Sequence, residues 1–509
     1  MTRSHPTGRS ASGFRNLFGS WILDLGSFLL DLGSSLVLGA WCLVLFSSGC
    51  AIGPRYHRPA VNAPTQFRSA DDTRSNKSIA DLDWWEVYQD ETLKELIQTS
   101  LTNNYDLRLA ISRVEQARAL AMQARAELLP QAGYQGEAAR GKNAVLGSPS
   151  PLAQGAVGNS FLAAFNASWE VDLWGRIRRL NESARAQFVA SEEARRGVTL
   201  SLVGDVAQAY FELLELDKEL EIAARTTNSF GESLRIFSQR FEGGVVSKLE
   251  TSRAEAALAT TAAAIPDLQR RVVIKENQLS VLLGRNPDTI PRRSALLQQT
   301  LPPDIPPGLP SRLLERRPDL RQAEQLARSA NAQIGVAMGD FLPKVGLTAL
   351  FGGVSSDLST LTSSGANVWS VAANVAGPIF QGGRLYGRYL QAKAQWDEAK
   401  LQYEQTALSA FQEVANALVS RQKLEEVRVH QTRAVAAYQE AVRVSTLRYV
   451  AGKASYYEVL EAQQQLFPAE NSLAQTQLNQ LLAFVQLYKA LGGGWEHEAR
   501  TSPNPARKK

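Results

Sequence analysis

The sequence predicts a mainly α-helical protein with a smaller membrane β component, arranged as two tandem repeats. Three observations predict this fold class. One long stretch of the chain recurs once, each copy holds two segments in which apolar residues alternate, and each copy continues into very long segments without proline. Each repeat should therefore contain two β-strands followed by long α-helices.

The repeat is visible as a constant offset between matching residues. Residues 175–284 match residues 383–492 at an offset of 208 without a gap, and upstream the offset is 213, as for Pro130 and Pro343. The difference is an insertion in the first copy, which we expect in an exposed loop. The offset defines repeat 1 over 105–284 and repeat 2 over 317–492. Outside the repeats lie a leader over 1–49, an N-terminal segment over 50–104, a proline-rich linker over 285–316 and a tail over 493–509.

Each repeat should begin with a helix, over about 105–128 and 318–341, that ends at a Leu-Pro pair because proline cannot continue it. The alternating segments follow and predict four strands at 131–139, 161–171, 345–351 and 369–375. These strands form two hairpins, about 131–172 and 343–377, with loops at 142–158 and 354–366. Alternation of apolar residues predicts strands but does not say what their apolar face contacts. The alternative to strands that span a membrane is therefore a soluble hairpin packed on the helices.

Long helices should fill 176–284 and 385–491, each interrupted by a turn that contains glycine, at 243–244 and 451–452. A run of about 54 residues without proline would make a helical rod of roughly 80 Å. Four strands are too few to close a membrane barrel, and lipid does not tolerate an open sheet edge. Three chains would supply twelve strands; the alternative is a long cytosolic coiled coil.

The first fifty residues have the order of a secretory leader: basic residues, an apolar run over 35–46, and small residues before Cys50. A transmembrane anchor is the alternative, but Asp24 and Asp31 would be costly within a bilayer. The end of the leader resembles the bacterial lipoprotein signal, which implies that Cys50 carries lipid. By the same resemblance, Ala51 favours the outer over the inner membrane.

No enzyme signature is present. The four histidines are scattered, the cysteines lie at positions 42 and 50, and the net charge of +5 is spread over 509 residues. We therefore expect no catalytic residue, no metal site, no cofactor other than the covalent lipid on Cys50, and no nucleic-acid partner.

Long stretches resemble the outer-membrane efflux proteins of the TolC/OprM type, in their lipoprotein (NodT) branch. They include SWEVDLWGRIRR at 168–179, GPIFQGGR at 377–384 and RYVAGKASYYEVLEAQQQL at 448–466. The resemblance implies a homotrimer whose 12-strand β-barrel continues into a 12-helix periplasmic α-barrel, with an equatorial collar. It also implies a lipid-anchored protein in the outer membrane of a Gram-negative bacterium. This protein would passively conduct substrates delivered by an inner-membrane pump of the resistance-nodulation-division type and a periplasmic adaptor, the membrane fusion protein.

The same resemblance points to a periplasmic gate. Glu458 and Glu461 match family carboxylates that ring the constriction, and Tyr449 matches a tyrosine that helps to latch the closed state, whereas Ala454 replaces an arginine of some members. A solvated helix face is the alternative interpretation of both glutamates. For the whole protein, two further functions stay open: the duct of a type I protein secretion system, and a periplasmic coiled-coil structural or adaptor lipoprotein.

Overall fold

The computed structural model describes residues 51–68, 82–142, 144–145, 148–149, 157–299 and 310–493. The predicted leader over 1–49, the predicted lipidation residue Cys50 and all but the first residue of the predicted tail lie outside the described residues. The chain divides into two compact units. Unit 1 comprises Met1–Arg55, Gln123–Glu182 and Ala332–Ala392, and unit 2 comprises Tyr56–Met122, Ser183–Asn331 and Lys393–Lys509.

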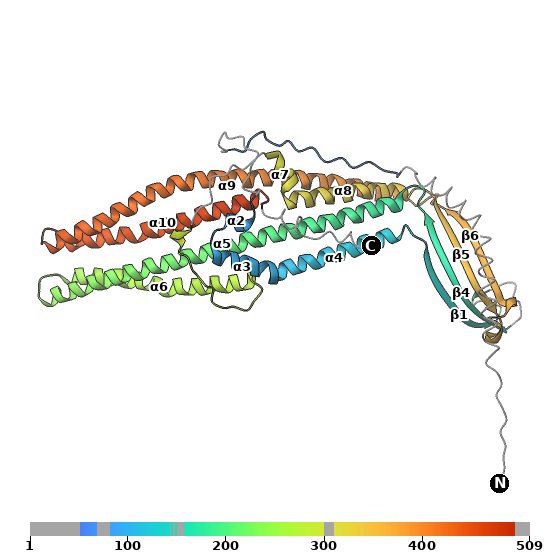
Figure 1. The fold of residues 1–509 in the computed structure, drawn as a ribbon, viewed down its shortest axis with the longest axis horizontal. Coiled ribbons are helices and arrows are strands. Elements are labelled where there is room, and N and C mark those ends of the chain that lie inside the picture. Colours follow the sequence, from blue (N-terminus) through green and yellow to red (C-terminus); the bar gives the residue numbers. More distant parts are fainter. Residues whose placement is uncertain are drawn as a thin grey trace, which may run out of the picture. The chain divides into compact units, whose positions relative to one another are not determined.

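Unit 1 contains one four-stranded antiparallel sheet in the order β1-β4-β5-β6 (Figure 1). Its strands are β1 (Gln131–Lys142), β4 (Val157–Val171), β5 (Lys344–Ser355) and β6 (Asn367–Ala376). All four segments predicted as strands lie within it. Pairing of β4 with β5 also joins the two predicted hairpins into a single sheet.

The connection between β1 and β4 was predicted as a plain hairpin loop, and that prediction was incomplete. It contains a small second sheet, formed by β2 (Ala144–Val145) and β3 (Ser148–Pro149). The loop of the second hairpin carries two short 3-10 helices, η4 (Leu358–Thr360) and η5 (Ser364–Ala366).

The longest helices are α5 (Arg176–Glu242) and α9 (Arg384–Val450), with 67 residues each. Each is longer than the run of about 54 residues from which a rod of roughly 80 Å was expected, because each continues to its glycine turn. Gly244 and Gly452 have φ angles of +71° and +69°, a conformation that glycine adopts without a Cβ penalty. The amide of Val245 donates to the Arg240 carbonyl at 2.8 Å, which is the 6→1 bond of a Schellman motif.

The chain then returns through α6 (Lys248–Leu282) and α10 (Tyr456–Ala490), with 35 residues each. The helices that precede the sheet, α4 (Tyr105–Ala126) and α8 (Pro318–Gly339), have 22 residues each. Corresponding helices of the two copies thus have equal lengths.

The remaining helices are short and lie outside the repeats: α2 (Trp84–Val87), α3 (Glu91–Asn103), η3 (Leu296–Gln298) and α7 (Pro310–Arg316). The last two lie within 285–316, the predicted proline-rich linker. Proline is well suited to the first position of a helix, where its missing N–H and fixed φ cost nothing, so Pro310 can start α7.

The main hydrophobic core of unit 2 packs α2 and α3 against α5 and α10. Two buried tyrosine hydroxyls of this core find partners. The Tyr488 hydroxyl donates to the Leu82 carbonyl at 2.8 Å, and the Tyr210 hydroxyl donates to Asp90 at 3.1 Å. Asp90 in turn accepts from the Leu93 amide at 3.1 Å and so caps α3. This core holds the middle of the long helices.

Candidate functional site

Near the glycine turns, an aromatic cluster joins the α5–α6 hairpin to the α9–α10 hairpin. It consists of Phe237 from α5, Tyr449 from α9 and Tyr456 from α10. The ring centroids lie 3.9 Å apart for Phe237 and Tyr456, and 5.4 Å apart for Tyr449 and Tyr456. Phe237 is 0% exposed, so the cluster is closed to water on that side. This cluster therefore joins the ends of α5 and α9 to the start of α10.

A cation lies on this cluster. The guanidinium carbon of Arg240 is 4.6 Å from the centre of the Tyr449 ring, which is within cation–π range. Burial raises the pKa of the Tyr449 phenol, with Arg240 acting in the opposite direction, and burial also raises the pKa of Tyr456. Both rings therefore stay neutral at physiological pH, the state in which a ring face attracts a cation.

The two predicted gate carboxylates lie on the surface beside this cluster rather than in it. Glu458 is the third residue of α10, where a carboxylate is stabilised by the helix dipole. One of its carboxylate oxygens lies 3.8 Å from an Arg448 guanidinium nitrogen, and both side chains are about half exposed, at 45% and 54%. Glu461, one turn later, is also exposed. The structure thus places Tyr449, which is half-buried, in the aromatic cluster and both glutamates on an exposed helix surface.

Phe237, Arg240 and Tyr456 were not predicted as site residues. The sequence offered a partial signal, because an arginine and an aromatic residue precede each glycine turn. That signal points to Phe241, which is 42% exposed, whereas the ring that enters the cluster is Phe237, one turn earlier.

Further contacts between the hairpins continue away from the turns. The Gln463 side-chain amide donates to the Ser229 hydroxyl at 2.9 Å. The Arg253 guanidinium lies 5.7 Å from the centre of the Tyr457 ring. Polar and cation–π contacts of this kind can be broken without exposing a large apolar core.

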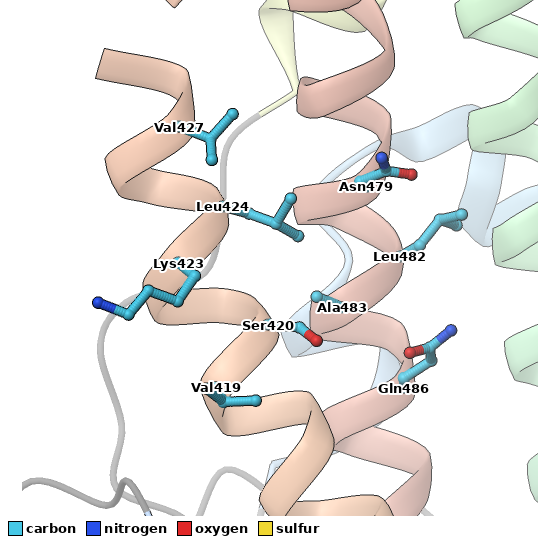
Figure 2. A pocket seen from close by; sticks show the side chains of 9 residues that line it. All are labelled: Val419, Ser420, Lys423, Leu424, Val427, Asn479, Leu482, Ala483 and Gln486. Carbon is cyan, nitrogen blue, oxygen red and sulfur yellow. The ribbon is translucent and has the colours of Figure 1, made fainter. Parts of the chain in front are cut away.

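An open groove of about 480 Å³ lies between α9 and α10 (Figure 2). Its lining mixes aliphatic and uncharged polar side chains, and the side chain of its single charged residue, Lys423, extends away from α10. The lining residues are Val419, Ser420, Lys423, Leu424, Val427, Asn479, Leu482, Ala483 and Gln486. This composition offers contact surface and no acid-base pair.

A second groove, of about 470 Å³, is lined by residues of α5, α6 and α10 and contains the buried carboxyl of Glu215. Burial and the nearby Glu219 carboxyl raise the pKa of Glu215 to about 8, while Arg271 acts against them. Across the groove, Arg271 pairs with Glu219 at 3.2 Å and Lys275 pairs with Glu212 at 2.6 Å. The raised pKa favours the protonated form of Glu215 in the folded protein.

The sheet of unit 1 has one exposed apolar face. Tyr134, Phe165, Phe351 and Trp369 are successive cross-strand partners and form a single row across β1, β4, β5 and β6. Their side chains are 85%, 70%, 38% and 63% exposed. The opposite face is mixed. It carries most of the polar residues of the sheet together with a few aliphatic ones, namely Asn166, Ser168, Thr348, Ser370, Asn374, Leu162, Leu350, Val354 and Val368. An aromatic row of this kind is typical of strands in contact with lipid.

No helix within the described residues combines the length and apolar character needed to cross a membrane. Within the same residues, no group of three or more His, Cys, Asp or Glu side chains is arranged to hold a metal ion.

Comparison with known proteins decides the family. The model of the family described as "Outer membrane efflux protein" matches residues 96–285 and 309–493. The chain belongs to the outer membrane efflux protein family. The resemblance to channels of the TolC/OprM type, drawn from sequence motifs, is thereby confirmed.

Individual relatives agree with this assignment. The efflux protein described here is 36% identical over 459 residues to the solvent efflux pump outer membrane protein SrpC of Pseudomonas putida, covering 89% of this chain and 97% of SrpC. It is 32% identical to the cation efflux system protein CusC of Escherichia coli K12, covering 89% and 98%. The open state of the MtrE outer membrane channel of Neisseria gonorrhoeae matches with a TM-score of 0.79 and 31% identity, covering 88% and 99%.

Proposed function

We propose that three copies of this efflux protein form the outer-membrane duct of a tripartite efflux pump. The duct is passive: an inner-membrane pump of the resistance-nodulation-division type supplies the energy, and a periplasmic adaptor couples the two. SrpC is named for solvents and CusC for cations. On this basis we propose small molecules or ions as the cargo.

The observation that carries this proposal is the sheet. Its apolar face is exposed along a full row of aromatic residues, and β1 and β6 lie at its two edges. An open edge and an apolar face are both unfavourable in water, and only a closed barrel resolves both in lipid. Pairing β6 of one copy with β1 of the next would close twelve strands in a trimer. Below the barrel, the equal-length helix pairs support a two-copy organisation and a helical conduit of twelve helices.

We also propose that Cys50 is lipidated and that its acyl chains enter the membrane at the end of the sheet that adjoins the helices. The chain just after Cys50 supports this position. The Ile52 amide donates to the Trp174 carbonyl at 2.9 Å, and the Arg179 guanidinium donates to the Ile52 carbonyl at 3.1 Å. These bonds fix residue 52 at the junction of β4 and α5.

For the gate, we propose that the closed state is held within each copy by the cluster of Phe237, Tyr449 and Tyr456. Glu458 and Glu461 would then supply up to six carboxylates around the entrance of a trimer, a cation-favouring ring. In planar bilayers, Glu458→Gln together with Glu461→Gln should weaken cation selectivity. An unchanged reversal potential would reject a pore role for these glutamates.

The proposed function is tested on the full chain in detergent. We expect a trimer on unheated SDS gels that converts to monomer on boiling, together with discrete single-channel conductance in planar bilayers. A protein that migrates as a monomer and does not conduct would support the periplasmic coiled-coil or adaptor alternative instead. A host that lacks its own channel separates the two duct functions, because a small-molecule efflux duct restores drug resistance and a type I duct restores protein secretion.

A further inference from the structure

The polar face of the sheet carries very few charges. Along the described residues of β1, β4, β5 and β6, the charged residues on this face are Glu137, Glu170 and Lys344. Glu170 and Lys344 belong to the ends of β4 and β5 that adjoin helices, whereas Glu137 lies toward the loop end of β1. The other polar residues on this face, such as Asn166 and Thr348, are neutral. Two of the three charges on this face, Glu170 and Lys344, are therefore concentrated at the end that adjoins the helices.

Glu170 is neutralised by a residue of the adjoining helix. The Arg176 guanidinium at the start of α5 donates to both carboxylate oxygens of Glu170, at 2.9 Å and 3.0 Å. A bidentate pair of this kind is held by geometry as well as charge. Arg176 is 18% exposed and Glu170 is 30% exposed, so the pair is partly shielded from water.

Lys344 is left as the excess charge. Its ammonium nitrogen lies 3.9 Å from Glu170, at the outer limit of an ion pair, and its side chain is 49% exposed. One carboxylate faces two cations, so the group carries one net positive charge per chain. Two further pairs of unit 1, Arg178 with Asp172 at 3.1 Å and Arg388 with Asp340 at 3.8 Å, are neutral in themselves.

We propose that Lys344 is a selectivity-determining residue that places a ring of positive charge inside the duct, at the end of the barrel that joins the helices. This inference rests on the proposed function, because the polar face lines a lumen only if three copies close the barrel. A trimer then carries three net positive charges at one level. A ring of one sign raises the local concentration of the opposite ion, so this level favours anionic solutes.

The ring acts in the opposite sense to the tip glutamates. Lys344 should attract anions where the strands meet the helices, whereas Glu458 and Glu461 would attract cations at the entrance. Ion selectivity then depends on both charge rings. Neutralising one ring should shift the selectivity toward the ion that the other ring attracts.

The test uses the intact trimer in planar bilayers under a KCl gradient. Lys344→Gln should lower the chloride-to-potassium permeability ratio by about two-fold at 0.1 M salt, and Lys344→Glu should lower it further. The effect should vanish near 1 M salt, where the Debye length is only about 3 Å. Lys344→Arg keeps the charge and should behave as the parent chain does.

The matched control is Lys142→Gln. Lys142 lies in the same sheet, but its register places it on the opposite face, opposite Val157. The variant loses the same charge, and its permeability ratio should stay at the parent value. Equal shifts in Lys142→Gln and Lys344→Gln would show a general effect of net charge and would overturn the proposal.

Chemical modification of a cysteine at position 344 allows the same folded channel to be measured before and after its charge is changed. The chain has no cysteine from residue 51 onward, so Lys344→Cys introduces a single new thiol into the body of the protein. A cationic methanethiosulfonate reagent should restore the anion preference, and an anionic reagent should reverse it. If the channel conducts but neither reagent moves the reversal potential, Lys344 does not face the lumen and the inference fails while the duct function stands. If the parent chain does not conduct at all, the proposed function fails first, and the inference with it.

Discussion

A single buried ring, Phe237, connects the two helical hairpins near their turns. It lies 3.9 Å from Tyr456 and is fully excluded from water, whereas Phe241, one turn further along the same helix, is 42% exposed. Arg240 adds a cation–π contact to Tyr449 from the same turn of α5. Nearest the turns, the described contacts between the two hairpins of one chain are thus mainly aromatic. We therefore expect their strength to depend more on ring packing than on salt concentration.

Phe237→Ala should loosen the closed tips. Removal of a buried phenylalanine ring costs about 3–5 kcal/mol, and here the loss falls on the contact between hairpins. We expect a higher single-channel conductance, measured in planar bilayers. Phe241→Ala is the control, since it removes the same ring from an exposed position and should conduct as the parent does. Equal conductance of the two variants would exclude the cluster as part of the gate.

At the scale of elements, the sheet combines two faces of opposite character. Val371 and Ser370 are neighbours on β6 and point to opposite faces, since Val371 pairs with Ala349 and Ser370 pairs with Leu350. Val371 is 71% exposed in the single chain. For a soluble protein, a charge at so exposed a position would be harmless. For a lipid-facing strand it would not.

Val371→Lys should therefore reduce the yield of heat-modifiable trimer, because a lysine on the lipid face costs about 2–4 kcal/mol near the bilayer midplane. Ser370→Lys introduces the same side chain one residue earlier, on the polar face, and should assemble normally. The measurement is the trimer fraction on unheated gels. Normal assembly of both variants would contradict a membrane position for this face.

The long helix α5 carries a buried titratable group, Glu215. Burial and the neighbouring Glu219 raise the pKa of Glu215 to about 8. A carboxyl group with a raised pKa in the folded state binds more protons folded than unfolded, so stability falls as the pH rises. The loss begins above the unfolded pKa near 4.5 and is complete above about 8. The surrounding charges are Glu212 and Glu219 on α5 and Arg270, Arg271 and Lys275 on α6.

Glu215→Gln should flatten the dependence of thermal stability on pH between about 5 and 8, since glutamine keeps the shape of the protonated acid without titrating. Melting temperatures of the detergent-solubilised protein across this range provide the measurement. Glu221→Gln on the same helix is the control, because Glu221 is 60% exposed and should leave the pH profile unchanged. A parent-like slope in Glu215→Gln would show that another group sets the pH dependence.

At the scale of the whole molecule, attachment to the membrane has two sources, the strands and the proposed lipid on Cys50. Each buried CH₂ of an acyl chain contributes about 0.8 kcal/mol, but one acyl chain alone anchors only weakly. A barrel with apolar strands does not need the lipid to stay inserted. The lipid would instead fix the N-terminal segment, whose residue 52 is bonded to the start of α5.

Cys50→Ala should abolish incorporation of labelled palmitate while leaving the protein in the membrane fraction. Cys42→Ala should keep the label, because Cys42 lies within the predicted leader, which the proposed processing removes from the mature protein. Autoradiography of the immunoprecipitated chain gives the result. Label retained on Cys50→Ala would show that the acyl group lies elsewhere.

The sequence by itself determined most of the elements, because their signals are local. Alternating residues predicted the strands, the Leu-Pro pairs predicted where α4 and α8 end, and the glycine turns predicted where α5 and α9 end. Proline and left-handed glycine act on their own backbone, so no distant contact was needed to place them. Motifs in the sequence also indicated the family.

Only the tertiary structure decided which elements meet. Pairing of β4 with β5 joins strands about 180 residues apart and merges two hairpins into one sheet. Burial of Phe237 instead of Phe241 depends on how α5 faces α9 and α10. The charge balance at Lys344 likewise needs Glu170 and Arg176 beside it. These contacts join segments that are remote in the chain, and helical or strand periodicity says which face a residue occupies but not what packs against that face.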